Sequence, residues 1–208
     1  MEKVLQKFID YYTNLSGGIS LEEVNFFEAN FSIQRLHKKE FFLKSGSIQK
    51  TMGYVVKGIF RRYYIDENGK EITSYFLHEN NFVTDYPVFV KQQSTRFYIE
   101  ALEPALIITL SYQKIQEGYS RFINFEKFGR LIAEDALMVQ TKRVEDFLFM
   151  KPEERYIDFV KNNNEIMNRV SLSHLSSLLG IERQSLSRIR KRILYIRLMS
   201  ISCNTGYY

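Results

Sequence analysis

The spacing of hydrophobic residues changes along the chain, and the first stretch has the spacing of helices. In that stretch the hydrophobic residues that recur with a helical period are Val4, Leu5, Phe8, Ile9 and Tyr12. Gly17 and Gly18 interrupt this period, and Ser20 followed by Glu23 resembles a capping box. We therefore predict two helices, the second ending near Phe27, that pack over a neighbouring sheet.

Between Phe31 and Leu110 the hydrophobic residues form short runs rich in aromatic and β-branched side chains, separated by turn signals. Asn68 and Gly69 lie between the runs FRRYYI and EITSYF and predict a hairpin, because both residue types tolerate positive φ. A helical pattern does not lie between successive runs, so a parallel sheet with helical crossovers fits poorly. The pattern predicts an antiparallel jelly-roll or β-roll.

The helical period returns after Ser111, with a short helix at about 112–117 and a long helix at about 122–149. The hydrophobic residues of the long helix lie on more than one face, and Asp135 and Lys142 interrupt its best heptad register. A helix that is hydrophobic on two sides must bury both. We expect one side to cover the roll and the other to meet a second subunit, the alternative being complete burial within a monomer.

The segment from Met150 to Pro152 predicts the boundary between two domains, at residues 1–150 and 151–208. Pro in the first turn of a helix, followed by acidic Glu153 and Glu154, is typical of a helix start. This helix is expected to end near Val160. Residues 194–208 are rich in hydrophobic residues without a clear period, and no role is assigned to them.

Residues 171–193 predict a helix-turn-helix. Hydrophobic residues recur at helical spacing on both sides of Gly180, at Leu172, Leu175, Leu178, Leu179, Leu186, Ile189 and Ile193. Gly180 is expected to end the first helix in a left-handed conformation, which is costly for other residue types. Ser176 is small enough to let the second helix approach closely. In such a motif the second helix enters the major groove of DNA.

The polar face of the second helix is the candidate DNA-binding surface. Turning its hydrophobic residues to the core places on the outer face or near the amino-terminal end of the helix Arg183, Gln184, Ser185, Ser187, Arg188 and Lys191. Arg and Gln contact guanine and adenine edges through two hydrogen bonds, whereas Lys and Ser suit phosphates. A solvated face on an ordinary helical hairpin is the alternative, but the concentration of basic residues favours DNA.

Composition narrows the classes of protein further. The 208-residue chain has a net charge of +5, and the basic residues gather near its carboxyl end, which favours a nucleic-acid partner. Its single cysteine, Cys203, excludes an internal disulfide framework, a cysteine-ligated zinc finger and a cysteine-held iron–sulfur cluster. Neither a signal sequence nor a membrane-spanning run is evident, so a cytoplasmic protein without membrane association is expected.

The order of β-roll, long helix, hinge and helix-turn-helix resembles the CRP/FNR family of bacterial transcription regulators. The likeness runs from Phe31 to Ile193 and is carried by VVKGIFRRYYIDENGKEITSYF and LSHLSSLLGIERQSLSRIRKRI. It implies an α+β protein with a β-roll like that of cyclic-nucleotide-binding domains, a dimerisation helix and a winged-helix-like carboxyl-terminal domain. It further implies a homodimer that binds an inverted-repeat operator in double-stranded DNA, with RNA polymerase as another candidate partner.

One position of the recognition helix limits what this resemblance carries over to the chain. By the match, Arg183, Gln184 and Arg188 lie where the family touches bases and phosphates. Gln184 replaces an acidic residue common in the family, so the operator sequence cannot be inferred. No cofactor is expected, and the small-molecule effector stays unknown.

The effector site departs from the pattern of cyclic-nucleotide binders. Thr84 and Asp85 stand where a Gly-Glu pair is expected, and Thr95 and Arg96 reverse the expected Arg-Thr order. Gly lets backbone N–H groups close on a phosphate, and Thr84 hinders that approach. We predict no tight binding of cyclic AMP, an ion pair of Arg96 with Asp85 or Glu100, and aromatic side chains that fill the core of the roll rather than line a pocket.

Two other functions are alternatives to a DNA-binding regulator. A cupin-like metalloenzyme needs clustered histidine ligands, whereas His37, His78 and His174 are far apart in the sequence. Motifs for a nucleophile, a phosphate loop or a metalloprotease are also missing, so neither catalytic nor metal-binding residues are expected. A protein-interaction module with a helix-turn-helix that does not bind DNA is the other alternative. Such a module has no need of the basic face.

Overall fold

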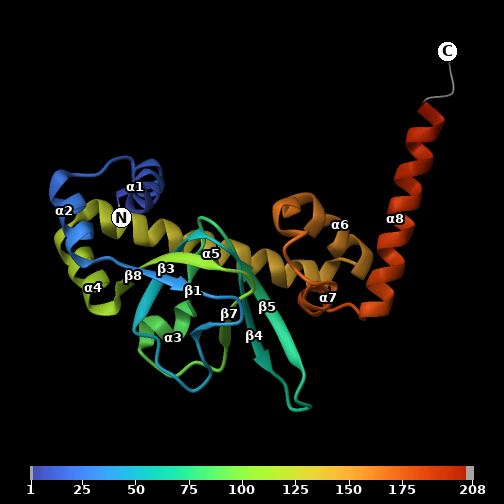
Figure 1. Ribbon diagram of the computed structural model, residues 1–208, viewed down its shortest axis with the longest axis horizontal. Helices are drawn as coiled ribbons and strands as arrows, with labels where there is room; N and C mark the ends of the chain where they lie inside the picture. Colours follow the sequence, from blue (N-terminus) through green and yellow to red (C-terminus); the bar gives the residue numbers. More distant parts are fainter. Residues whose placement is uncertain (1, 205–208) are drawn as a thin grey trace. The chain divides into compact units, whose positions relative to one another are not determined.

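The computed structural model describes the backbone of residues 2–204 and the side chains of residues 3–193. The chain divides into two compact units, residues 1–143 and 144–208 (Figure 1). The predicted boundary at Met150–Pro152 coincides with a junction between two helices, while the division into compact units falls a few residues earlier, within the long helix.

The first unit begins with two helices, α1 (Glu2–Ser16) and α2 (Leu21–Asn30). Gly17 adopts a φ of 88°, which ends α1 and confirms the predicted break. The hydroxyl of Ser20 accepts the N–H of Glu23, and the Glu23 carboxylate accepts the N–H of Ser20 in return. The predicted capping box is therefore confirmed, and α2 extends beyond the expected end at Phe27 to Asn30.

Eight strands follow and form two antiparallel four-stranded sheets (Figure 1). In chain order they are β1 (Ser32–Leu36), β2 (Phe41–Leu43), β3 (Thr51–Lys57), β4 (Phe60–Ile65), β5 (Glu71–Leu77), β6 (Phe82–Val83), β7 (Tyr98–Ala101) and β8 (Ala105–Ser111). One sheet has the order β1-β8-β3-β6 and the other has the order β2-β7-β4-β5. The predicted antiparallel roll is confirmed.

Alternate residues of the same strand serve two hydrophobic cores, because successive side chains of a strand point to opposite faces. Val55 of β3 and Ile107 of β8 belong to the core inside the roll. Tyr54 and Ile108, their neighbours in sequence, belong to an outer aromatic core formed with the helices. This second core fastens the helices to one outer face of the roll.

The hairpin predicted at Asn68-Gly69 joins β4 to β5 through residues 66–70. The Asp66 carboxylate accepts the N–H groups of Asn68 and Lys70, each at 2.9 Å. Within this turn Gly69 adopts positive φ, at 76°, whereas Asn68 does not. The hairpin is confirmed, and the side chain of Asp66 supplies part of its geometry.

Three helices complete the first unit: α3 (Tyr86–Lys91), α4 (Tyr112–Arg121) and α5 (Ile123–Phe149), the last of which continues into the second unit. Figure 1 shows α1, α2 and α4 gathered around the first turns of α5, and the outer aromatic core joins them. Phe125 and Phe128 are buried there, whereas Leu137 and Met138 are 67% and 63% exposed. The long helix is confirmed, and the exposed residues on it leave room for the predicted subunit contact.

The second unit holds the end of α5, then α6 (Pro152–Asn162), a 3-10 turn η1 (Asn164–Ile166), α7 (Leu172–Leu179) and α8 (Arg183–Asn204). Its residues up to Asn204 contain no strand, so the winged-helix-like expectation is corrected to an all-helical unit over this range. The reason is that no Gly or Pro occurs between Arg183 and Asn204 to reverse the chain into a wing. The role of residues 194–208 stays open, because their side chains lie outside the described part.

Candidate functional site

The turn of the helix-turn-helix depends on Gly180. This residue ends α7 with φ 62° and ψ 37°, the left-handed conformation that the sequence predicted. The following N–H, of Ile181, donates to the carbonyl of Ser176 at 3.0 Å and closes the end of the helix. A Cβ atom on Gly180 would lie 2.8 Å from Cε1 of Phe147, so both backbone conformation and space require glycine here.

The two helices of the motif pack through the predicted hydrophobic residues. Leu186 on α8 is completely buried, and Leu175 on α7 is 2% exposed. Ser176 is also buried, and its hydroxyl donates to the carbonyl of Ser173 at 2.9 Å, so its polar group is satisfied within the helix. The predicted register of both helices is confirmed.

The predicted DNA-contacting residues lie on the solvent side of α8. The exposed side chains among them are Arg183, Gln184, Ser185, Arg188 and Lys191, whereas Ser187 is half-buried. Arg192 is exposed as well but forms an ion pair with Glu153 of α6, so part of its charge serves the unit itself. The arrangement presents two guanidinium groups, an amide and an ammonium group on one helix whose opposite side is buried.

Arg155 is a contributor to this unit that the sequence pattern did not reveal. Its Nε donates to the carbonyl of Leu179 at 3.1 Å, and its Nη1 donates to the carbonyl of Met150 at 2.9 Å. Its guanidinium also lies 4.7 Å from the ring centre of Phe147. One side chain of α6 thus links the end of α5 to the turn that precedes α8.

In the first unit, three of the four candidate effector residues come together around a buried carboxylate. Asp85 is 3% exposed, and its Oδ1 accepts Nη2 of Arg62 at 2.7 Å. Its Oδ2 accepts the hydroxyl of Thr95 at 2.5 Å. The N–H of Asp85 donates to Oε1 of Gln49 at 2.9 Å, and Thr84 lies within hydrogen-bonding distance of the same Gln49 side chain. The arrangement joins four segments of the roll.

The fourth candidate, Arg96, is not part of this group. Its side chain is exposed, and its guanidinium lies 5.5 Å from the ring centre of Phe97. The expected ion pair of Arg96 with Asp85 is wrong, because the carboxylate of Asp85 pairs with Arg62 of β4 instead, at 2.7 Å. The expected pairing with Glu100 is also wrong, since Glu100 lies opposite Arg61 in the register of β4 and β7.

Arg62 and Gln49 are therefore the site residues that the sequence did not single out. Burial lowers the pKa of Arg62, and the neighbouring Asp85 opposes that change. An arginine in a run of strand residues is the only sequence signal, and β4 contains two of them. Arg61 and Arg62 are neighbours in the strand and therefore point to opposite faces of the sheet. Arg61 pairs with Glu71 at 2.5 Å.

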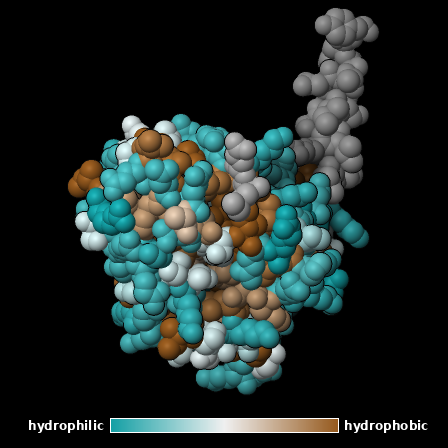
Figure 2. Space-filling view, turned by 60° about the vertical axis from the view of Figure 1, so that its left-hand side comes forward, coloured by the Kyte–Doolittle hydropathy of each residue, from teal (hydrophilic) through white to brown (hydrophobic). Residues whose placement is uncertain are grey.

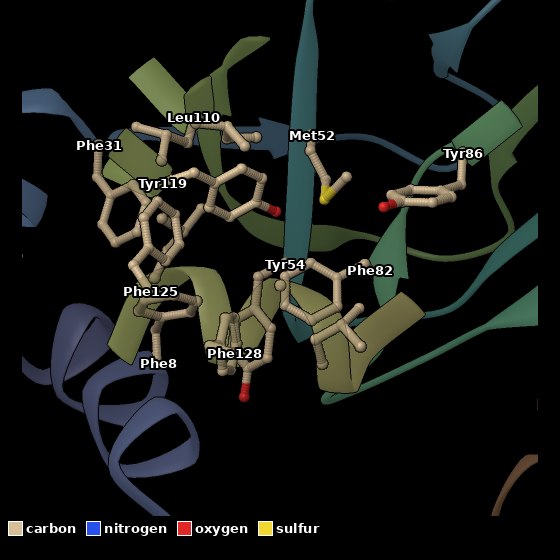
Figure 3. A pocket seen from close by; sticks show the side chains of 14 residues that line it. Phe8, Phe31, Met52, Tyr54, Phe82, Tyr86, Leu110, Tyr119, Phe125 and Phe128 are labelled. Carbon is tan, nitrogen blue, oxygen red and sulfur yellow. The ribbon is translucent and has the colours of Figure 1, made fainter. Parts of the chain in front are cut away.

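A cavity of about 550 Å³ lies beside this group, between the roll and α5. Its lining includes Met52, Arg62, Phe82, Tyr86, Ile132 and Asp135. A separate aromatic pocket measures only about 40 Å³, room for about one to three water molecules (Figure 3). The aromatic side chains thus fill most of the outer core. The sequence did not predict the larger cavity.

Two further structural findings concern the described residues alone. No group of three or more His, Cys, Asp or Glu side chains is arranged there as metal ligands would be. Within the same part of the chain, the helices are too short or too polar to cross a lipid bilayer.

Comparison with known proteins gives three consistent likenesses. The profile of the cyclic nucleotide-binding domain matches residues 33–122. The chain is 21% identical over 182 residues to the cAMP-activated global transcriptional regulator CRP of Escherichia coli O6:H1, a match that covers 82% of this chain and 86% of that relative.

Solved structures agree with this result at the level of the fold. The c-di-GMP responsive global regulator CLP of Xanthomonas campestris superposes with a TM-score of 0.66 at 16% identity, over 84% of this chain and 92% of that chain. A transcriptional regulator of the Crp/Fnr family from Eubacterium rectale superposes with a TM-score of 0.68 at 14% identity, over 88% of each chain.

Proposed function

The chain belongs to the CRP/FNR family of transcription regulators, and from that premise we propose that it binds a specific DNA sequence as a homodimer through α8. The relatives are regulators rather than enzymes, which supports the expectation that this chain has no catalytic activity. The observation that carries the proposal is the exposed basic face of α8 above the buried Leu186.

The residues of that face have distinct roles in the proposal. Gln184 and Arg188 contact base edges in the major groove, because their planar groups form paired hydrogen bonds with adenine and guanine. Lys191 contacts phosphates, as do Arg183 near the positive end of the helix dipole and the hydroxyls of Ser185 and Ser187. Leu186 holds the face in position from behind.

The proposed dimer uses the exposed side of α5. Hydrophobic side chains with large exposed fractions occur along this helix, at Leu137 (67%), Met138 (63%), Val144 (59%) and Leu148 (70%). Figure 2 shows that hydrophobic residues on the face it presents form separate patches within a largely hydrophilic surface. Pairing of two copies along α5 places two α8 helices in successive major grooves, about 34 Å apart. The expected operator is therefore an inverted repeat.

We further propose that this regulator does not respond to cyclic AMP. Asp85 already neutralises Arg62, and Gln49 already takes the N–H group of Asp85. An incoming phosphate would have to displace both of these internal contacts. Calorimetry with cyclic AMP should show no micromolar binding, and such binding would contradict this part of the proposal.

The DNA-binding surface is tested by charge reversal. The full chain is titrated with a mixed-sequence duplex, and binding is followed by fluorescence anisotropy at several salt concentrations. Arg188→Glu and Lys191→Glu should each weaken binding by at least about tenfold and reduce its salt dependence. Lys57→Glu is the matched control, because Lys57 is exposed on the roll and loses the same charge.

Equal weakening by all three variants would show only a general effect of net charge. Equal affinity of all three would assign the chain to the interaction modules that keep a helix-turn-helix without binding DNA.

A further inference from the structure

The junction between α5 and α6 consists of Met150 and Lys151, and hydrogen bonds hold every backbone polar group of both residues. The N–H of Met150 donates to the carbonyl of Asp146 at 3.1 Å, and the carbonyl of Met150 accepts Nη1 of Arg155 at 2.9 Å. The N–H of Lys151 donates to the carboxylate of Glu154 at 2.7 Å, and its carbonyl accepts the N–H of Arg155 at 3.0 Å. Linker residues without such bonds rotate about their soft backbone dihedrals, whereas these contacts hold the junction in one conformation.

The side chain of Arg155 connects this junction to the helix-turn-helix. Its Nε donates to the carbonyl of Leu179, the last residue of α7, at 3.1 Å. The carbonyls of a last helical turn lack partners within the helix and carry the negative end of the helix dipole, so a cationic donor suits them. A guanidinium holds its N–H groups in a fixed planar fork. One rigid group therefore spans the carbonyls of Met150 and Leu179.

The last turn of α5 reaches the same part of the motif through Phe147. The guanidinium of Arg155 lies 4.7 Å from the ring centre of Phe147. A Cβ atom on Gly180 would lie only 2.8 Å from Cε1 of that ring, so the ring lies against the turn between α7 and α8. The second compact unit accordingly begins at Val144, within α5. The end of α5 is thus part of the DNA-reading unit.

One other ion pair joins α6 to α8, between Glu153 and Arg192. Both of these side chains are partly exposed to solvent, and such surface pairs contribute little. Arg155 is half-buried, and its charged donors bind main-chain carbonyls on two different segments. Arg155 is therefore the stronger connection between α6 and the helix-turn-helix.

We propose that Arg155 is a positioning residue for DNA recognition, which holds α7 and α8 in a fixed orientation to the end of α5. This proposal rests on the proposed function, in which two copies pair along α5 and place their α8 helices in successive major grooves. Two α8 helices fixed in this way have one separation, so the protein should select operators by the spacing of their half-sites. One base pair more or less moves a half-site by about 3.4 Å and turns it by roughly 35° around the duplex.

The test uses the full chain and the half-site that it enriches from a random DNA pool. Duplexes carry two inverted copies of this half-site, with spacers that differ in steps of one base pair, and a further duplex carries a single copy. Fluorescence anisotropy measures the affinity for each duplex. The parent should bind one spacing at least about tenfold more tightly than spacings one base pair longer or shorter, because only that geometry lets both helices bind together.

Two variants of Arg155 test the connection itself. Arg155→Met removes both donors, and it should reduce the preference for one spacing to less than about threefold while the affinity for the single half-site stays within about twofold of the parent. Arg155→Lys keeps the charge but loses the fork, and its preference should lie between those of the parent and Arg155→Met. Arg35→Met is the matched control, because Arg35 is exposed on β1 and loses the same charge. It should keep the spacing preference of the parent.

The possible failures are distinguishable. A parent that binds all spacings with similar affinity would overturn the proposal without any variant. A spacing preference that stays at the parent value in Arg155→Met, or in Arg155→Lys if circular dichroism shows that only this variant folds, would mean that Arg155 merely stabilises the fold. Failure of the parent to enrich any half-site would overturn the proposed DNA binding, and this inference with it.

Discussion

At the scale of single residues, Gly180 carries two separate constraints, and they can be measured apart. Its φ of 62° is unfavourable for residues with a Cβ atom, and such an atom would also approach the ring of Phe147 to 2.8 Å. Gly69 shares the first constraint, at φ 76°, but has open space around the position of a Cβ atom. The pair separates backbone strain from crowding.

Gly180→Ala should therefore cost more stability than Gly69→Ala. The strain alone accounts for roughly 1–2 kcal/mol in each variant, and the displacement of Phe147 adds to it only in the helix-turn-helix. Thermal unfolding followed by circular dichroism gives both values. Equal losses would show that the Phe147 ring moves aside without cost.

Glu100 gives a prediction about pH. Burial raises the pKa of its carboxyl group, while the nearby Arg61 acts in the opposite direction. The folded protein thus binds this proton more tightly than the unfolded chain, and the stability contributed by the group falls as pH rises through its ordinary value. Glu100→Gln should raise the melting temperature at neutral pH and give no gain near about pH 3. A lower melting temperature at neutral pH would mean that the contact with Arg61 outweighs burial.

The role of a residue could be predicted from the sequence where its neighbours within one turn determine that role. It could not be predicted where the partner is distant in the sequence. Gly180 and the pair of Ser20 with Glu23 act within one turn of helix, so their roles were predicted. The partner of Asp85 is Arg62, 23 positions away and on another strand, so the sequence suggested the nearer arginine instead. The ion pair depends on how the roll closes.

At the scale of elements, the register of α8 decides which side chains are available for the proposed contact with DNA. Leu186 is completely buried against α7, and Arg190 on the same helix is exposed. The same helix therefore offers a buried and an exposed position for comparison.

Leu186→Ala should destabilise the second unit by about 2–5 kcal/mol through the cavity that it leaves. Arg190→Ala should change the stability by less than about 0.5 kcal/mol, because the side chain is exposed. Chemical denaturation followed by circular dichroism measures both. An unchanged midpoint for Leu186→Ala would mean that the register of α8, and with it the assignment of the DNA-binding face, is wrong.

The exposed side of α5 gives the corresponding prediction for assembly. Leu137→Glu places a charge in the proposed subunit contact and should convert dimers to monomers in analytical ultracentrifugation. Gln34→Glu, which adds the same charge at an exposed position of β1, is the control and should remain dimeric. A monomeric parent protein would refute the dimer directly.

Element boundaries followed the sequence where caps or breakers mark them and departed where they do not. Pro152 begins α6 as predicted, and α7 ends at Leu179 before Gly180. The second helix of the motif runs on to Asn204 because nothing in the sequence stops it earlier. The sequence contains no signal for the large cavity, because the cavity depends on how side chains of distant segments pack.

At the scale of the whole molecule, the order of the elements carried more information than any one of them. A roll, a long helix and a helix-turn-helix each occur in many proteins, and their succession pointed to the family that the comparisons support. The ligand and the DNA sequence depend on individual side chains rather than on the order of the elements. Gln184 is such a side chain in the proposed DNA contact.

The central claim, a dimer that presents two α8 helices to successive major grooves, is tested most directly by selecting bound duplexes from a random DNA pool with the full chain. The account predicts enrichment of an inverted repeat whose half-site centres lie one helical turn, about 10 base pairs, apart. Enrichment of a single half-site would contradict the dimer, and the absence of any enriched sequence would contradict specific DNA binding.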